Sequence, residues 1–99
     1  MRRGTVVGHA LRDRRFVVVS CQAITDTGTV VVAEIADAVP SGARGMLAVP
    51  LTDADPVPGA VLSWRINYMA ADRLGGQLGE LSAETVERLD MALRATLDL

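Results

Sequence analysis

Several features are missing from this sequence, and each absence excludes a class of protein. With one cysteine, Cys21, and one histidine, His9, the chain can form no internal disulfide and no Cys/His zinc site of its own. No apolar run approaches the roughly 18 residues of a membrane span, and the N-terminus lacks the apolar stretch of a secretory signal. The sequence therefore predicts a cytoplasmic protein that keeps Cys21 reduced and uses no metal, cofactor or membrane.

Aromatic residues are also scarce, at 3% of the 99 residues. The core must therefore be built from the aliphatic side chains that dominate the 49% hydrophobic content. A chain of this length has room for one domain, which we expect to span residues 1–99. A small aliphatic domain often gains stability by dimerising, so a homodimer is expected.

Lysine is absent, and all ten basic residues are arginine. Residues 1–15 carry five arginines and one aspartate, a net charge of +4, whereas residues 16–99 carry five arginines and eleven acids, a net charge of −6. Arginine binds phosphate through a planar fork whose charge is not titrated away. This basic N-terminal segment indicates either phosphate recognition or a solvated arm whose arginines reflect codon usage.

Short β-branched runs separated by turn residues dominate the first 67 residues. The runs 16–19 and 30–32 are rich in valine and predict central strands, with Arg12 and Asp13 as a tight turn before the first of them. Residues 25–28 predict another turn. Strands are expected over 5–11, 16–19, 29–35, 46–49, 60–67 and 77–81, with one helical turn at 70–74.

One amphipathic helix is predicted at the C-terminus, over residues 83–97. Ser82 is its expected N-cap, and Glu84 complements the positive end of the helix dipole. Apolar side chains recur there with helical spacing and form one packing stripe: Val86, Leu89, Leu93 and Leu97. The fold class is therefore mainly β with a C-terminal helix, a small curled sheet or barrel with strands between about residues 4 and 81.

Most residues with chemical potential have a structural explanation. Asp53 and Asp55 lie in an Asp-Ala-Asp-Pro turn, and the glycines of residues 75–79 match neither a dinucleotide nor a phosphate-loop fingerprint. His9 shares a strand face with apolar neighbours, which favours a packed or edge histidine. These residues predict no catalytic or metal site.

Arg14 and Arg15 are different, because they open the buried strand 16–19 and a strand fixes where a guanidinium points. Fixed positive charge stabilises the oxyanion that develops in phosphate chemistry. Strand alternation places the two side chains on opposite faces, so one of them should dominate; the sequence leaves open which one.

The order of segments resembles that of the MazF/PemK toxins along nearly the whole chain. Arg-Arg-Phe-Val-Val-Val-Ser at 14–20 is similar to the family's Arg-Pro-Val-Val-Val-Val-Ser, and Val-Val-Val-Ala-Glu-Ile-Ala at 30–36 to its Val-Val-Val-Ala-Pro-Ile-Thr. Arg-Leu-Gly-Gly-Gln-Leu-Gly-Glu-Leu-Ser at 73–82 resembles Arg-Leu-Gly-x-x-Leu-Gly-x-Leu-Ser. Residues 89–99 resemble the family's closing helix.

This resemblance implies an SH3-like β-barrel of the CcdB/PemK/MazF type, usually homodimeric. It implies the toxin of a type II toxin–antitoxin pair, a metal-independent endoribonuclease that cleaves single-stranded RNA through attack of the ribose 2′-hydroxyl on the adjacent phosphate. An acidic, MazE-like antitoxin would cover the site. Arg14 stands at the place of the family's catalytic arginine, and the residues expected to bind RNA are Arg12, Arg15, Ser20 and Arg65.

Three departures from the family pattern leave other functions open. Ala36 stands where the family has its catalytic threonine, Arg65 replaces a glutamine, and the first inter-strand loop is reduced to Arg12 and Asp13. One alternative is a protein that keeps the fold and binds an antitoxin or RNA without cleaving. Another is a CcdB-like poison of a protein target, although the only tryptophan is at position 64 rather than in a C-terminal tail. An unrelated small barrel is the third.

Overall fold

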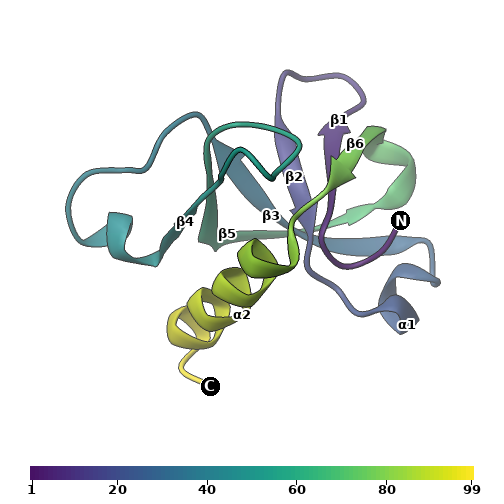
Figure 1. Ribbon diagram of the computed structural model, residues 1–99. Helices are drawn as coiled ribbons and strands as arrows, with labels where there is room; N and C mark the ends of the chain where they lie inside the picture. The colour runs from purple at the N-terminus through teal and green to yellow at the C-terminus, as the bar shows by residue number, and fades with distance from the viewer.

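A six-stranded antiparallel sheet and a C-terminal helix make up the protein (Figure 1), in a computed structural model that describes residues 1–99. The strand order is β4-β5-β3-β2-β1-β6, so β1 pairs with β2 and β2 with β3, whereas β3 pairs with β5 rather than with β4. The strands are β1 Thr5–His9, β2 Arg15–Val18, β3 Thr29–Ala36, β4 Ala48–Pro50, β5 Ala60–Ala70 and β6 Leu74–Glu80. The helices are α1 Gln22–Thr25, α2 Ala83–Leu97 and two 3-10 turns, η1 Ala43–Leu47 and η2 Ala71–Arg73.

The expected fold class, mainly β with a C-terminal helix, is confirmed, and the curled sheet is open rather than closed. β4 and β6 lie at opposite ends of the strand order and do not pair. Closure requires a continuous ladder between the outer strands. β4 has only three residues and ends in Pro50, while β6 pairs with β1 through two register shifts. Neither strand therefore presents the regular edge that closure needs.

Both faces of the central strands are buried, as their continuous valine runs predict. The α2 helix packs along β4 and β5 (Figure 1), and Leu89 in its apolar stripe is fully enclosed. The core between α2 and the sheet includes Val6, Val17, Ile35 and Val61 together with Leu89 of the helix. The opposite face carries a second apolar cluster around one aromatic ring: Phe16, Val7, Val18, Val30 and Val32.

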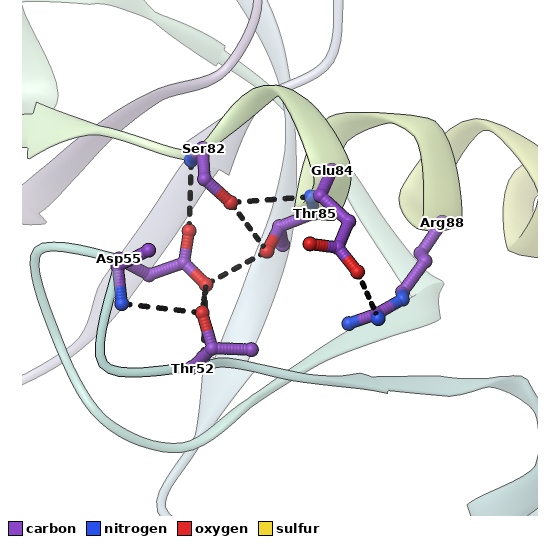
Figure 2. A network of polar contacts seen from close by, with 7 residues as sticks. Thr52, Asp55, Ser82, Glu84, Thr85 and Arg88 are labelled. Carbon is purple, nitrogen blue, oxygen red and sulfur yellow. Dashed lines mark hydrogen bonds and ion pairs between the residues drawn. The ribbon is translucent and has the colours of Figure 1, made fainter.

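The predicted helix 83–97 is confirmed, and a polar network fixes its first turn (Figure 2). Ser82 accepts a hydrogen bond from the Thr85 N–H at 3.2 Å. Asp55, in the loop before β5, accepts hydrogen bonds from the Ser82 N–H at 2.8 Å and the Thr85 hydroxyl at 2.8 Å. It also accepts the N–H and hydroxyl of Thr52. This Asp55 network ties the loop of residues 51–59 to the start of α2.

The Asp55 network also sets the pKa of its own carboxyl. Burial by itself would raise the pKa of Asp55, but the N–H groups of Ser82 and Thr52 and the hydroxyls of Thr85 and Thr52 outweigh it. The pKa therefore lies below its ordinary value of 3.8. Hydrogen bonds donated to a carboxylate favour its charged form.

The turn expected at 25–28 is confirmed, since residues 26–28 form a turn in which the Gly28 N–H donates to the Thr25 carbonyl at 3.2 Å, directly after the short helix α1. The first loop differs from its prediction: the connection from β1 to β2 runs over residues 10–14 and is longer than the predicted pair Arg12 and Asp13. His9 explains this difference, because its Nδ1 accepts the N–H groups of Leu11 and Arg12 at 3.0 and 3.2 Å and so stabilises a wider loop. The chain contains no helix long and apolar enough to cross a membrane.

Candidate functional site

Three charged side chains meet on the sheet face opposite α2, and we call them the Arg–Glu–Arg cluster: Arg14, Glu34 and Arg65. Arg14 donates from Nε to Glu34 Oε1 at 3.3 Å, and its Nη2 lies 3.1 Å from Oε2. The Nε of Arg65 lies 2.7 Å from the same Oε2. Two guanidiniums therefore share one carboxylate, with side-chain exposures of 35%, 56% and 20% for Arg14, Arg65 and Glu34.

Strand register places Arg14 and Glu34 together. Glu34 on β3 lies directly across from Phe16 on β2, and Arg14 is two residues before Phe16 and shares its face. The Arg14 guanidinium carbon lies 5.2 Å from the centre of the Phe16 ring, a cation–π contact. Because Phe16 is fully buried among valines, this contact rests on a rigid support.

A bulge in β5 brings in Arg65. Ala33 pairs with Ile66 and the next residue, Glu34, pairs with Leu62, so residues 63–65 have no partners on β3. Ser63 is buried, where its hydroxyl donates to the Leu47 carbonyl at 2.7 Å. Arg65 emerges on the outer side of the bulge, beside Glu34.

Small pockets flank Glu34 on two sides. One, of about 110 Å³, is lined by the whole Arg–Glu–Arg cluster together with Phe16, Ile66 and Asn67. The other, of about 330 Å³, opens at the end of β3 and is lined by Asp13, Arg14, Arg15, Glu34, Ile35, Ala36 and Asp37. Arg14 and Glu34 line both pockets, so a bound group in either would meet both side chains.

Ala36 lies in the larger pocket, at the position where a threonine was expected from the resemblance. It brings no hydroxyl to this wall. The loop before β5 approaches closely here, because a Cβ built on Gly59 would lie 2.1 Å from the Ala36 carbonyl oxygen. Gly59 also has a φ of 117°, so only glycine fits this approach without moving the loop.

Arg15 also lines the larger pocket, but its guanidinium has other partners. Its Nη1 donates to the Pro58 carbonyl at 2.8 Å, and its Nη2 donates to Asp37 at 3.0 Å. Asp37 is fully exposed, whereas the Arg15 side chain is 21% exposed. Arg15 therefore ties the loop before β5 to the end of β3.

The remaining expected RNA-binding residues lie in different places. Arg12 is exposed in the loop between β1 and β2, and its guanidinium makes no hydrogen bond or ion pair. Ser20 is buried after β2, where its hydroxyl contacts Thr25 at 2.9 Å and accepts the Val31 N–H at 3.2 Å. It lines a separate, mostly apolar pocket of about 690 Å³ between α1 and the end of α2. The structure thus brings Arg14, Arg15 and Arg65 together and leaves Ser20 apart.

Glu34 is the site residue that the sequence analysis missed. Its charge could have singled it out, since Glu34 is the only charged residue in the strand Thr29–Ala36. Elsewhere, no three His, Cys, Asp or Glu side chains converge in a group that could hold a metal ion.

The fold combines an open antiparallel sheet with a C-terminal helix on one face and an arginine-rich cluster on the other. Residues 3–97 match the model of the PemK-like, MazF-like toxins of type II toxin–antitoxin systems. The chain belongs to this family, and the resemblance inferred from its segments is confirmed.

Solved structures give the same answer for the fold. An endoribonuclease from a mycobacterial species is 27% identical with a TM-score of 0.88, and the match covers 100% of this chain and 92% of that one. A mycobacterial endoribonuclease in complex with its cognate antitoxin is 25% identical with a TM-score of 0.89, covering 100% and 96%. A MazE–MazF complex from Deinococcus radiodurans, at 22% identity, a TM-score of 0.80 and coverage of 99% and 96%, shares the fold. No curated protein sequence matches the chain.

Proposed function

We propose that this protein is the toxin of a type II toxin–antitoxin pair and that it cleaves single-stranded RNA without a metal ion. The observation that carries the proposal is the placement of Arg14. Its guanidinium lines two pockets beside a second guanidinium, Arg65, in a chain of the MazF-like family. Two structural neighbours at 25% identity or above are endoribonucleases.

The proposed reaction is attack of a ribose 2′-hydroxyl on the adjacent phosphorus. The new O2′–P bond forms as the P–O5′ bond breaks, which yields a 2′,3′-cyclic phosphate and a free 5′-hydroxyl. Arg14 is the proposed catalytic residue, and its task is to stabilise the negative charge of the pentacoordinate phosphorane. Arginine donates hydrogen bonds but does not accept protons, so Arg14 does not act as a base.

The RNA backbone is proposed to follow the arginines around the β1–β2 loop. Arg12 is exposed and free of partners, Arg65 is half-exposed beside the smaller pocket, and Arg15 lines the larger one. Fixed arginines attract phosphates in a salt-dependent way. An acidic antitoxin segment would bind the same basic surface and block it.

We also propose that the protein acts in the cytoplasm as a homodimer. Support for the dimer comes from apolar side chains that remain exposed along and beyond α2, namely Met91, Leu97 and Leu99. Only 22 of 99 residues are buried, so burial of more surface would stabilise the fold. Sedimentation at micromolar concentration tests this, and a monomer there contradicts it.

The cleavage test uses purified protein in EDTA with a diverse pool of single-stranded RNA. The wild type is expected to cut, and Arg14→Ala is expected to cut about 100- to 1,000-fold more slowly. Arg88→Ala is the matched control, because Arg88 is an exposed arginine on α2 that pairs only with Glu84. Absence of any cleavage by the wild type, or equal cleavage by Arg14→Ala, overturns the proposal.

One observation favours a second candidate, a family member that binds RNA or antitoxin without cleaving. Ala36 offers no hydroxyl to the larger pocket. Expression in bacteria separates the two functions, since a nuclease should arrest growth and Arg14→Ala should relieve the arrest. Growth arrest that depends on Arg14 would exclude the non-cleaving candidate.

A further inference from the structure

We infer that Glu34 is the general base of the reaction, taking the proton from the attacking 2′-hydroxyl. This inference rests on the proposed ribonuclease function and adds a catalytic residue to it. The position is unusual for the family pattern, since Glu34 stands where the resembling segment has proline. A carboxylate at this position gives the pocket a group that can accept a proton.

Proton acceptors at the two pockets are few, and Glu34 is the best placed. Arg14, Arg15 and Arg65 cannot accept a proton. The other two carboxylates, Asp13 and Asp37, line only the larger pocket, and Asp37 is fully exposed and bonded to Arg15. Glu34 alone among the carboxylates lines both pockets beside Arg14.

His9 is the obvious competitor, because histidine is the commonest general base. Its backbone N–H donates to the Arg14 carbonyl at 3.0 Å, so the residues are neighbours across β1 and β2. Its Nδ1, however, already accepts the N–H groups of Leu11 and Arg12. The Nε2 atom then carries the ring proton and has no lone pair for the substrate. His9 also lines a different pocket, with Asp72 and Arg73.

The contacts of Glu34 leave one oxygen ready to accept. Oε2 is shared by both guanidiniums at 3.1 and 2.7 Å, whereas Oε1 has only the long 3.3 Å hydrogen bond from Arg14. Each carboxylate oxygen offers two acceptor sites. Oε1 therefore retains an open site next to the arginine that would hold the phosphate.

The proposed step moves one proton from the substrate to Glu34 and another from solvent to the leaving group. Glu34 Oε1 takes the 2′-hydroxyl proton as O2′ bonds to phosphorus, and O5′ leaves with the electron pair of the P–O5′ bond. A solvent water protonates O5′, and Glu34 later returns its proton to solvent. Neutralisation of Glu34 weakens its ion pairs at the moment when negative charge develops on the phosphorane, so Arg14 and Arg65 become available to that charge.

The test compares Glu34→Gln with Glu84→Gln, which makes the same change on the exposed face of α2. Glu34→Gln is expected to lower the single-turnover cleavage rate by about 100-fold or more, and Glu84→Gln to leave it unchanged. Binding of an oligonucleotide with 2′-deoxyribose at the cleavage site should be equal or tighter in Glu34→Gln, because a negative charge has been removed. Glu34→Asp should retain part of the rate.

The pH dependence of the cleavage rate distinguishes a general base from a residue with a purely structural role. The groups facing Glu34 are Arg14 from the β2 end and Arg65 from β5, with Asp13, Arg15 and Asp37 around the larger pocket. The acid-side fall of the wild-type rate should be absent from the residual rate of Glu34→Gln. If Glu34→Gln is poorly folded, the acid limb of Glu34→Asp decides the question.

The outcomes separate this inference from the proposed function. Wild-type cleavage with equal or faster cleavage by folded Glu34→Gln overturns the general base and leaves the nuclease intact, with Glu34 restraining Arg14 instead. An unchanged acid limb in the glutamine variant overturns it as well. A wild type that cuts no RNA removes both.

Discussion

Asp55 and Glu34 each bind several donors, but the donors differ in kind. Asp55 accepts two backbone N–H groups and two hydroxyls, all from the loop 51–59 and the start of α2 (Figure 2). Glu34 faces two guanidiniums and lies between pockets. Neutral donors consume the acceptor sites of Asp55 and join two segments, whereas the charged partners of Glu34 are themselves suited to bind an anion.

Asp55 therefore stabilises the fold, whereas Glu34 is placed to act in the proposed site. Removing Asp55 takes away the acceptor of two part-buried donors, the Ser82 N–H and the Thr85 hydroxyl, whereas Thr52 is exposed to water. Removing Glu34 leaves two partly exposed arginines that water can solvate. Stability should therefore depend on the first carboxylate and cleavage on the second.

The largest effect on stability is expected from Asp55→Ala. Loss of a charged acceptor with four hydrogen bonds should lower the free energy of unfolding by about 2–3 kcal/mol. Urea unfolding measures this, with Asp53→Ala as the control in the same loop. The folded fraction of Asp55→Ala should still cut RNA at the wild-type rate; a loss below about 0.5 kcal/mol contradicts the structural role.

Measuring the free energy of unfolding at several pH values tests the stabilising role of Asp55. Its pKa is lower in the folded protein than the ordinary 3.8, so its charged form stabilises the fold at neutral pH. This stabilisation is complete above the unfolded pKa and is lost as the pH falls through the folded one. The unfolding free energies of the wild type and Asp55→Asn should therefore converge below about pH 4. A constant difference down to acid pH would count against the prediction.

Arg65→Ala removes one of the two arginines that contact Glu34. Cleavage should fall by about 10-fold, less than for Arg14→Ala, because Arg65 is more exposed and lacks an aromatic support. The dependence of RNA binding on salt should weaken by about one phosphate contact. Titrations at several salt concentrations check this, and unchanged cleavage and salt slope would remove Arg65 from the site.

The smallest effect is expected from Arg15→Ala. Loss of the hydrogen bond to the Pro58 carbonyl should reduce stability by about 1 kcal/mol. The ion pair with fully exposed Asp37 should add little, so Asp37→Ala should be nearly neutral. A cleavage defect in Arg15→Ala as large as that of Arg14→Ala would reverse the roles of the two neighbours.

Much of the fold was predictable because its signals are local. Continuous valine runs at 16–19 and 30–32 predicted buried central strands, and Ser82 with the apolar stripe predicted the helix 83–97. The first loop was predicted too short, because the acceptor that shapes it is a side chain, His9 Nδ1. Whether the curled sheet closes could not be predicted, since closure depends on outer strands far apart in the sequence.

The site was predictable only in part. Arg14 could be singled out because it opens a rigid strand, but its partner Glu34 is fixed by cross-strand register, which no local pattern shows. Arg65 reaches Glu34 through the bulge at residues 63–65, where the buried Ser63 hydroxyl bonds to Leu47 on η1 and Thr96 on α2. Such contacts form only once the chain has folded.

The open sheet leaves two margins with unpaired backbone groups, and such margins invite fibre growth by addition of strands from other copies. β4 offers only three residues, and Pro50 at its end has no N–H to donate. Along β6, glycines and shifted register interrupt a regular template. Both margins of the sheet therefore disfavour the addition of a strand from another copy.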